Sequence, residues 1–123
     1  EGVAIVGYED RMADTYAAAA VVVCRAGSST LAELCAVGLP SVLVPSPNVT
    51  DNHQEGNARG LERAGAARVV LERGMNPDQV AAEVDALVAD PAALTAMGQA
   101  ARGLARLDTA AQVGRLVDGL LRR

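Results

Sequence analysis

The feature that most constrains the fold is a regular alternation of short apolar runs with segments of helical spacing. Four runs rich in valine and other aliphatic residues recur between polar turns, at 3–6, 21–24, 41–44 and 67–71. Between them the apolar residues recur every three or four positions, which indicates helices. A strand–helix alternation of this kind predicts a parallel sheet with helices on both faces.

Glycine, proline and a capping residue mark where these elements begin and end. Asp10 can cap a helix that carries Met12, Tyr16 and the alanines to Ala20. Gly38 is placed to end the helix after the second strand, and Pro40 prevents that helix from continuing. Each predicted element is therefore short.

Beyond Gly74 the pattern is helical only. Three apolar stripes follow one another, and they consist of Val80, Val84, Leu87 and Val88, then Leu94, Met97, Ala101 and Leu104, then Val113, Leu116, Val117 and Leu120. We expect a helical tail over about 77–123. The predicted fold is α/β: a partial doubly wound parallel sheet, about half of a nucleotide-binding sheet, with a helical C-terminal tail.

Composition excludes several classes of function. Eleven basic and fifteen acidic side chains give a formal charge of −4, and the chain has no Phe or Trp. A nucleic-acid partner is not expected, because such binders carry basic surfaces and aromatic stacking platforms. The longest apolar stretch, Ala17 to Cys24, is too short to span a bilayer. Cys24 and Cys35 lack zinc-ligand spacing and make no disulfide scaffold, so buried thiols in a reducing compartment are expected.

The first candidate site is the polar turn that follows the second apolar run. Ligands of open parallel sheets bind beyond the carboxyl ends of the strands, and residues 25–30 hold that position. Gly27 allows a close approach of backbone to ligand, and the N-terminus of the following helix offers N–H groups and partial positive charge. The hydroxyls of Ser28, Ser29 and Thr30 add donors. The turn is suited to a diphosphate.

Glu33 allows two interpretations. It lies one helical turn beyond Thr30 and on the same face, where its carboxylate can accept hydrogen bonds from both hydroxyls of a ribose. The residues from Thr30 to Glu33 also fit a capping box, with Thr30 as the N-cap and Glu33 reaching back to its N–H. The residues alone leave both interpretations open.

A second polar segment, 51–57, precedes the next helix and holds the chain's single histidine, His53. The amides of Gln54 and Asn57 can both donate and accept hydrogen bonds, which suits sugar hydroxyls. The alternative is a solvated loop with Asp51 or Asn52 as a helix N-cap. No second histidine or cysteine pair supports a metal site.

Taken together, these segments resemble a known enzyme family. CRAGSSTLAEL at 24–34, with GLP at 38–40 and VP at 44–45, resembles the donor-site segment of GT-B glycosyltransferases. DNHQ at 51–54, AGAA at 64–67 and GYEDRMA at 7–13 make the chain most similar to the MurG family. The resemblance covers the whole chain, strongly over 7–73 and loosely in the helical tail.

The resemblance implies a role for each matched residue. Glu33 falls on the glutamate that holds the ribose hydroxyls, and the backbone of Glu9, beside Met12, falls where uracil is bound. The diphosphate turn corresponds to Gly27, Ser28, Ser29 and Thr30. The sugar contacts correspond to His53, Gln54 and Asn57, with Gln54 the direct contact. The position of Ser29 is usually apolar in the family, so a role for its side chain is not implied.

The resemblance also implies an activity. The family uses UDP-GlcNAc as donor and transfers GlcNAc, with inversion, to the lipid-linked muramoyl-pentapeptide precursor of peptidoglycan. It needs no cofactor or metal, and it works in the cytoplasm on the inner face of the membrane. Residues 1–123 then form the C-terminal UDP-sugar-binding part, and the acceptor-binding N-terminal domain with the proposed catalytic base is missing. We therefore expect this chain alone to be inactive.

Two further expectations concern what the missing domain would cover. A sheet without its first strands exposes an apolar edge and invites self-association. The last helix, 110–121, packs on the N-terminal domain in the family and lacks that partner here. The alternative functions are a donor-binding part of another GT-B UDP-sugar transferase, for glycolipids or natural products, a separate donor-binding subunit, and a structural domain without a ligand.

Overall fold

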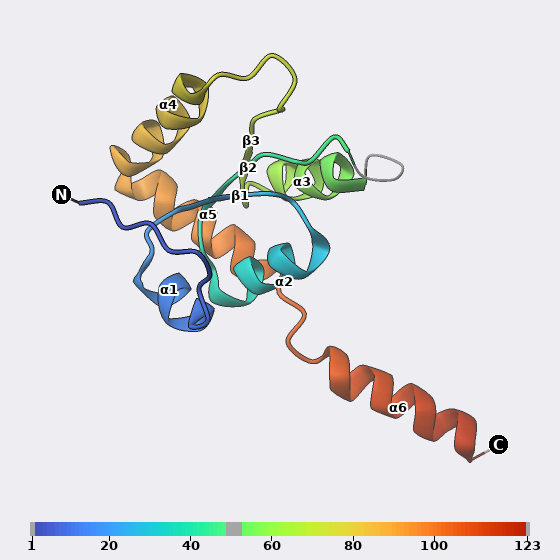
Figure 1. The fold of residues 1–123 in the computed structure, drawn as a ribbon. Helices are drawn as coiled ribbons and strands as arrows, with labels where there is room; N and C mark the ends of the chain where they lie inside the picture. Colours follow the sequence, from blue (N-terminus) through green and yellow to red (C-terminus); the bar gives the residue numbers. More distant parts are fainter. Residues whose placement is uncertain (1, 49–52, 123) are drawn as a thin grey trace.

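The computed structural model describes residues 2–48 and 53–122 and contains a three-stranded parallel sheet (Figure 1). The strands are β1 (Val22–Cys24), β2 (Ser41–Leu43) and β3 (Arg68–Val69), in the order β1-β2-β3. Val22 pairs with Ser41, and Val42 pairs with Arg68. The helices are α1 (Met12–Ala18), α2 (Ser28–Val37), α3 (His53–Arg63), α4 (Pro77–Val88), α5 (Pro91–Gly103) and α6 (Thr109–Leu121). The α2 and α3 helices connect successive strands, as parallel pairing requires.

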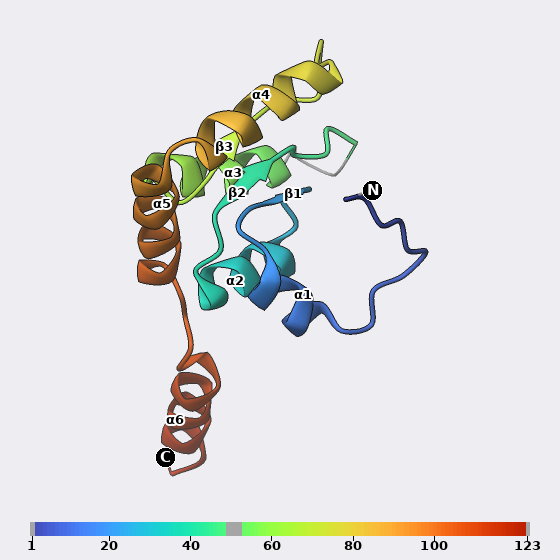
Figure 2. The same cartoon turned by 90° about the vertical axis from the view of Figure 1, so that its left-hand side faces the viewer.

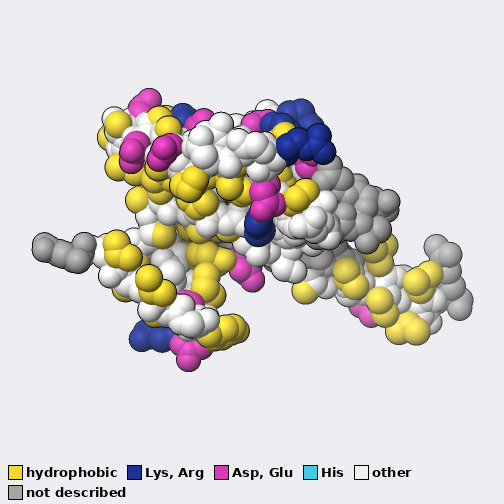
Figure 3. All heavy atoms as spheres, turned by 45° about the horizontal axis from the view of Figure 1, so that its top comes forward, with side chains coloured by type: hydrophobic (Ala, Val, Ile, Leu, Met, Phe, Trp, Pro, Cys, Tyr) yellow, Lys and Arg dark blue, Asp and Glu magenta, His cyan; other side chains and the backbone are white. Residues whose placement is uncertain are grey.

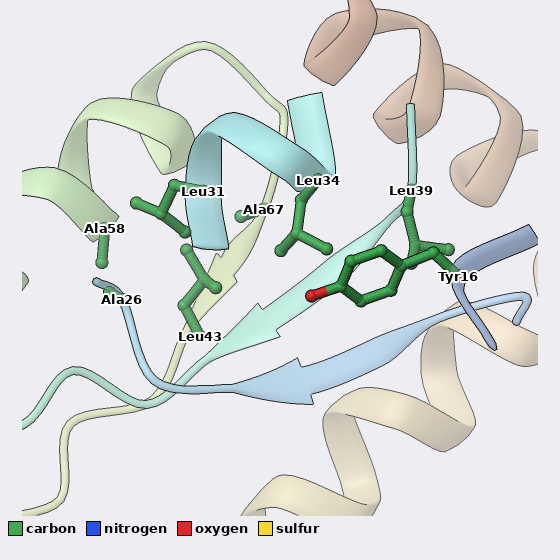
Figure 4. Close-up of a cluster of buried hydrophobic side chains, with 8 residues drawn as sticks. All are labelled: Tyr16, Ala26, Leu31, Leu34, Leu39, Leu43, Ala58 and Ala67. Carbon is green, nitrogen blue, oxygen red and sulfur yellow. The ribbon is translucent and has the colours of Figure 1, made fainter. Parts of the chain in front are cut away.

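Helices cover both faces of the sheet because successive side chains of the central strand point in opposite directions. Leu43 packs into a cluster formed by α1, α2 and α3, which contains Tyr16, Ala26, Leu31, Leu34, Leu39, Ala58 and Ala67 (Figure 4). Val42 packs on the other face against Leu87 of α4 and Met97 of α5. This arrangement confirms the predicted doubly wound α/β fold.

The C-terminal end of α2 is held by a close crossing with α5. Gly38 ends α2 in the left-handed conformation, with φ 74°, as its glycine predicted. A Cβ at Gly98 would lie 2.7 Å from the carbonyl oxygen of Gly38, so the two backbones approach too closely for any side chain. The Arg102 guanidinium donates to the Val37 carbonyl at 2.6 Å. The crossing therefore holds the C-terminal end of α2 against α5.

Two predictions about the N-terminal segment are wrong. Residues 3–6 do not form a strand; Val3 is 81% exposed and Ile5 is 93% exposed. A strand forms only where its backbone pairs with a neighbour, and residues 3–6 pair with none of the described strands. Asp10 does not cap α1, whose N-cap is Arg11 without a side-chain hydrogen bond. Instead, the Glu9 carboxylate accepts the N–H of Arg11 at 2.8 Å.

The third apolar stripe of the tail forms the helix α6 but is not buried. Leu116 is 71% exposed and Val117 is 46% exposed. The helix extends away from the sheet in both ribbon views (Figures 1 and 2), and hydrophobic side chains lie at the surface along it and near the N-terminal end (Figure 3). Within the described part of the chain, no helix is long and apolar enough to cross a membrane.

Candidate functional site

The N-terminus of α2 lies directly beyond the carboxyl end of β1. The strand ends at Cys24, and α2 begins at Ser28 with Gly27 as its N-cap. The first bond of the helix runs from the Leu31 N–H to the Gly27 carbonyl at 3.0 Å, and no side chain among the described residues caps this end. The N–H groups of Ser28, Ser29 and Thr30 therefore have no carbonyl acceptor inside the helix. Such a terminus can receive an anion.

The second polar segment lies beside this turn. It follows β2, and the carboxyl ends of neighbouring parallel strands meet at the same edge of the sheet. Its first two residues, Asp51 and Asn52, lie outside the described residues, so the N-cap alternative for them remains a prediction. From His53 onward the segment is helix rather than loop, because α3 begins there. His53 is exposed at the first position of α3. Gln54 and Asn57 follow on the first turns.

Gln54 and Asn57 bind backbone groups. The Gln54 Oε1 accepts the N–H of Ala26 at 3.2 Å and the N–H of Ser46 at 2.9 Å. The Asn57 Nδ2 donates to the Ala26 carbonyl at 3.4 Å. The structure thus brings Gln54 and Asn57 together with the turn at Gly27. Their predicted contacts with a sugar remain predictions.

Glu33 is not part of a capping box. The helix begins at Ser28, so Thr30 is its third residue rather than its N-cap, and that alternative is wrong. The Glu33 side chain instead accepts a hydrogen bond from the Tyr16 hydroxyl at 3.3 Å. Tyr16 is 9% exposed, and burial, with the neighbouring Glu33 carboxylate, raises the pKa of its phenol. The ribose interpretation of Glu33 remains a prediction.

Tyr16 is the site residue that sequence reasoning missed. Its position indicated only the apolar face of the first helix, and seventeen positions separate it from Glu33. The one available signal was chemical, because a buried tyrosine hydroxyl usually finds a hydrogen-bond partner. Only the tertiary contact between α1 and α2 shows that this partner is Glu33.

The predicted uracil contacts lie at the start of α1. Glu9 precedes the helix, and Met12 is its first residue, with 38% of its surface exposed. The Tyr16–Glu33 hydrogen bond joins this helix to α2. The role of Glu9 and Met12 in binding a base remains a prediction.

A cavity of about 340 Å³ lies beyond β2 and β3, next to the site. It is lined by Pro45, Pro47, Glu55, Leu71, Glu72 and Arg73. Arg25, from the turn after β1, pairs with Glu72 at 3.1 Å and donates to the Val44 carbonyl at 3.3 Å. The ion pair ties the loops after β1 and β3 together.

The cysteines are both free, and Cys35 is buried while Cys24 is half-buried. Burial raises the pKa of each thiol, which lowers its reactivity. Over residues 2–48 and 53–122, no group of three or more His, Cys, Asp or Glu side chains is placed to hold a metal ion.

Comparison with known proteins identifies the family. Residues 1–113 match the model of the glycosyltransferase family 28 C-terminal domain. A UDP-N-acetylglucosamine–N-acetylmuramyl-(pentapeptide) pyrophosphoryl-undecaprenol N-acetylglucosamine transferase of Geobacter metallireducens is 46% identical over an alignment that covers 98% of this chain and 33% of the relative. The transferase of the same name from Caldanaerobacter subterraneus is 43% identical over 95% of this chain and 32% of its own length.

A solved structure agrees with these matches. The crystal structure of Acinetobacter baumannii MurG superposes with a TM-score of 0.83 at 31% identity, covering 93% of this chain and 34% of that one. The chain thus spans about a third of the length of the relatives it matches. The resemblance to the MurG family is confirmed. The chain belongs to the glycosyltransferase family 28 C-terminal domains and, within them, to the MurG group.

Proposed function

We propose that this chain is the donor-binding part of a transferase that moves GlcNAc from UDP-GlcNAc to the lipid-linked muramoyl-pentapeptide precursor of peptidoglycan. The observation that carries the proposal is the uncapped N-terminus of α2 at the carboxyl end of β1, beside Gln54 and one turn from Glu33. The names of the related transferases supply the donor and the acceptor.

Each group in the site has a proposed part in holding the donor. The N–H groups of Ser28, Ser29 and Thr30 receive the diphosphate, because the helix terminus carries partial positive charge there. Glu33 accepts the ribose hydroxyls, and its hydrogen bond from Tyr16 limits the positions its carboxylate can take. Glu9 and Met12 contact the uracil, and the first turn of α3, with His53, Gln54 and Asn57, faces the sugar.

The same geometry suits the transfer step in the whole enzyme. An acceptor hydroxyl attacks the anomeric carbon, the bond from that carbon to the diphosphate breaks, and the configuration inverts. Negative charge grows on the departing UDP, where the α2 N-terminus stabilises it without reorganising. The acceptor and the catalytic base belong to the remaining two thirds of the enzyme, so this chain alone does not complete the reaction. Because the acceptor carries an undecaprenol chain, we place the whole enzyme at the inner face of the membrane.

An NMR titration tests the binding site. UDP added to the ¹⁵N-labelled chain is expected to shift the amide resonances of Ser28, Ser29 and Thr30 most strongly, because their N–H groups meet the diphosphate. Shifts concentrated at Leu71, Glu72 and Arg73 would place the nucleotide in the neighbouring cavity and overturn the proposal.

A further inference from the structure

We infer that Gln54 is a positioning residue, whose amide oxygen fixes the diphosphate turn against the loop after β2. The inference rests on the proposed function, and it changes the part that Gln54 plays in it. The resemblance gives this side chain to the sugar alone, whereas its contacts tie two backbone segments together.

The orientation of the Gln54 amide follows from its partners. Two backbone N–H groups, of Ala26 and Ser46, point at one side-chain atom at 3.2 and 2.9 Å. Two donors require an acceptor, so this atom is the oxygen and the other is the NH₂ group. Both lone pairs of the oxygen are then used. Only the Nε2 remains for a ligand, and it lies 3.9 Å from the place a Cβ at Gly27 would take.

Both backbone polar groups of Ala26 bind side chains of α3. Its N–H binds Gln54, its carbonyl accepts from Asn57, and its side chain is fully buried in the cluster that contains Ala58. The Ala26 carbonyl and the Gly27 N–H belong to one planar trans peptide, so fixing the first fixes the direction of the second. The clamp therefore sets where α2 begins and how its N-terminal N–H groups point.

This placement predicts a specific pattern of affinities. A contact with the transferred GlcNAc matters only for UDP-GlcNAc, whereas a misplaced diphosphate turn weakens the binding of UDP as well. The substitution Gln54→Met keeps the length of the side chain and removes the acceptor. UDP, which lacks the transferred GlcNAc, should then bind about tenfold more weakly, since each lost hydrogen bond is worth roughly a factor of two to ten. The loss of the amide oxygen affects both ligands, so the Kd of UDP-GlcNAc should rise by at least the same factor.

The experiment measures the Kd of UDP and UDP-GlcNAc for the wild-type chain, for Gln54→Met and for Gln99→Met. Gln99 is exposed on α5, so Gln99→Met makes the same chemical change away from the site and should leave both Kd values unchanged. Unchanged UDP affinity in Gln54→Met, with weaker UDP-GlcNAc, would make Gln54 a sugar contact only and overturn the inference.

Amide hydrogen exchange tests the clamp without any ligand. The N–H groups of Ala26 and Ser46 should exchange faster in Gln54→Met and at the wild-type rate in Gln54→Glu, because a carboxylate accepts the same two bonds. Equal exchange in the wild type and Gln54→Met would refute the clamp itself. Failure of the wild-type chain to bind UDP would instead refute the proposed function, so the two failures are distinguishable.

Discussion

Replacing Glu33 by glutamine separates folding from ligand binding. Glu33 lies in the middle of α2, and within the described chain its side chain makes one hydrogen bond, which comes from the Tyr16 hydroxyl at 3.3 Å. Glutamine keeps an oxygen that can accept this bond, and its helix propensity is close to that of glutamate. We therefore expect Glu33→Gln to change the free energy of unfolding by less than about 0.5 kcal/mol.

The effect on UDP should be much larger. If the carboxylate holds both ribose hydroxyls, the amide loses a charged acceptor and turns a donor toward one hydroxyl. Hydrogen bonds to charged groups are worth about 1.5–3 kcal/mol, which corresponds to roughly a ten- to 150-fold increase in Kd. Long-range electrostatics predicts the opposite sign, because removing a negative charge beside a diphosphate favours binding, by about 1 kcal/mol at most for a solvated pair. The sign of the change therefore decides between the two effects.

Isothermal titration of UDP measures this change. Glu62→Gln is the matched control, since it removes an equally charged carboxylate from α3 that pairs with Arg59 at 2.8 Å. Titration with 2′-deoxy-UDP adds a second control, because Glu33→Gln should weaken this ligand less than it weakens UDP. Unchanged or tighter binding of UDP by Glu33→Gln would refute the ribose role.

Three further predictions concern the turn, the helix crossing and the response to pH. Gly27 has φ −66°, and the nearest atom to an added Cβ is 3.9 Å away. Gly27→Ala should therefore fold with nearly unchanged stability but bind UDP more weakly. Equal UDP affinity would show that no ligand approaches the turn closely. Gly98→Ala should destabilise the chain by about 1–3 kcal/mol in urea unfolding because its Cβ meets the Gly38 carbonyl at 2.7 Å. Gly60→Ala in α3, with open space around it, should stabilise the chain by about 0.5–1 kcal/mol; equal stability of the two variants would contradict the close crossing. Burial and Glu33 raise the pKa of Tyr16 above its ordinary 10.0. The stability that the neutral phenol contributes is therefore complete below about pH 10 and is lost as the pH rises through the folded-state pKa. Tyr16→Phe should lose less stability than the wild type between about pH 8 and pH 11, and an equal loss would count against the buried phenol.

The parts of the fold that follow from local patterns were predictable from the sequence. The apolar runs at 21–24 and 41–44 predicted β1 and β2, but only β2 is buried at every position, as a central strand covered on both faces should be, whereas Val23 of β1 is 45% exposed. Gly38 predicted the end of α2, because glycine adopts the left-handed conformation of a helix end most readily. The run at 3–6 is also apolar but pairs with none of the described strands, and composition alone does not reveal whether a partner exists.

The site was predictable to the level of its segments but not of its contacts. The turn at Gly27 followed from its place after a strand and before a helix. The sequence from Thr30 to Glu33 fits both a capping box and the interior of a helix that starts three residues earlier, so the start of α2 needed the structure. The clamp by Gln54 and the partner of Tyr16 depend on contacts 28 and 17 residues apart, which no local spacing encodes.

The proposed function requires that this chain binds a UDP-sugar at the N-terminus of α2. Isothermal titration of the chain with UDP-GlcNAc, UDP-glucose and a GDP-sugar, each with and without EDTA, tests it most directly. We predict that UDP-GlcNAc binds most tightly, that the GDP-sugar does not bind, and that EDTA changes neither result. Equal affinity for the GDP-sugar, no binding of UDP-GlcNAc, or loss of binding in EDTA would contradict the account.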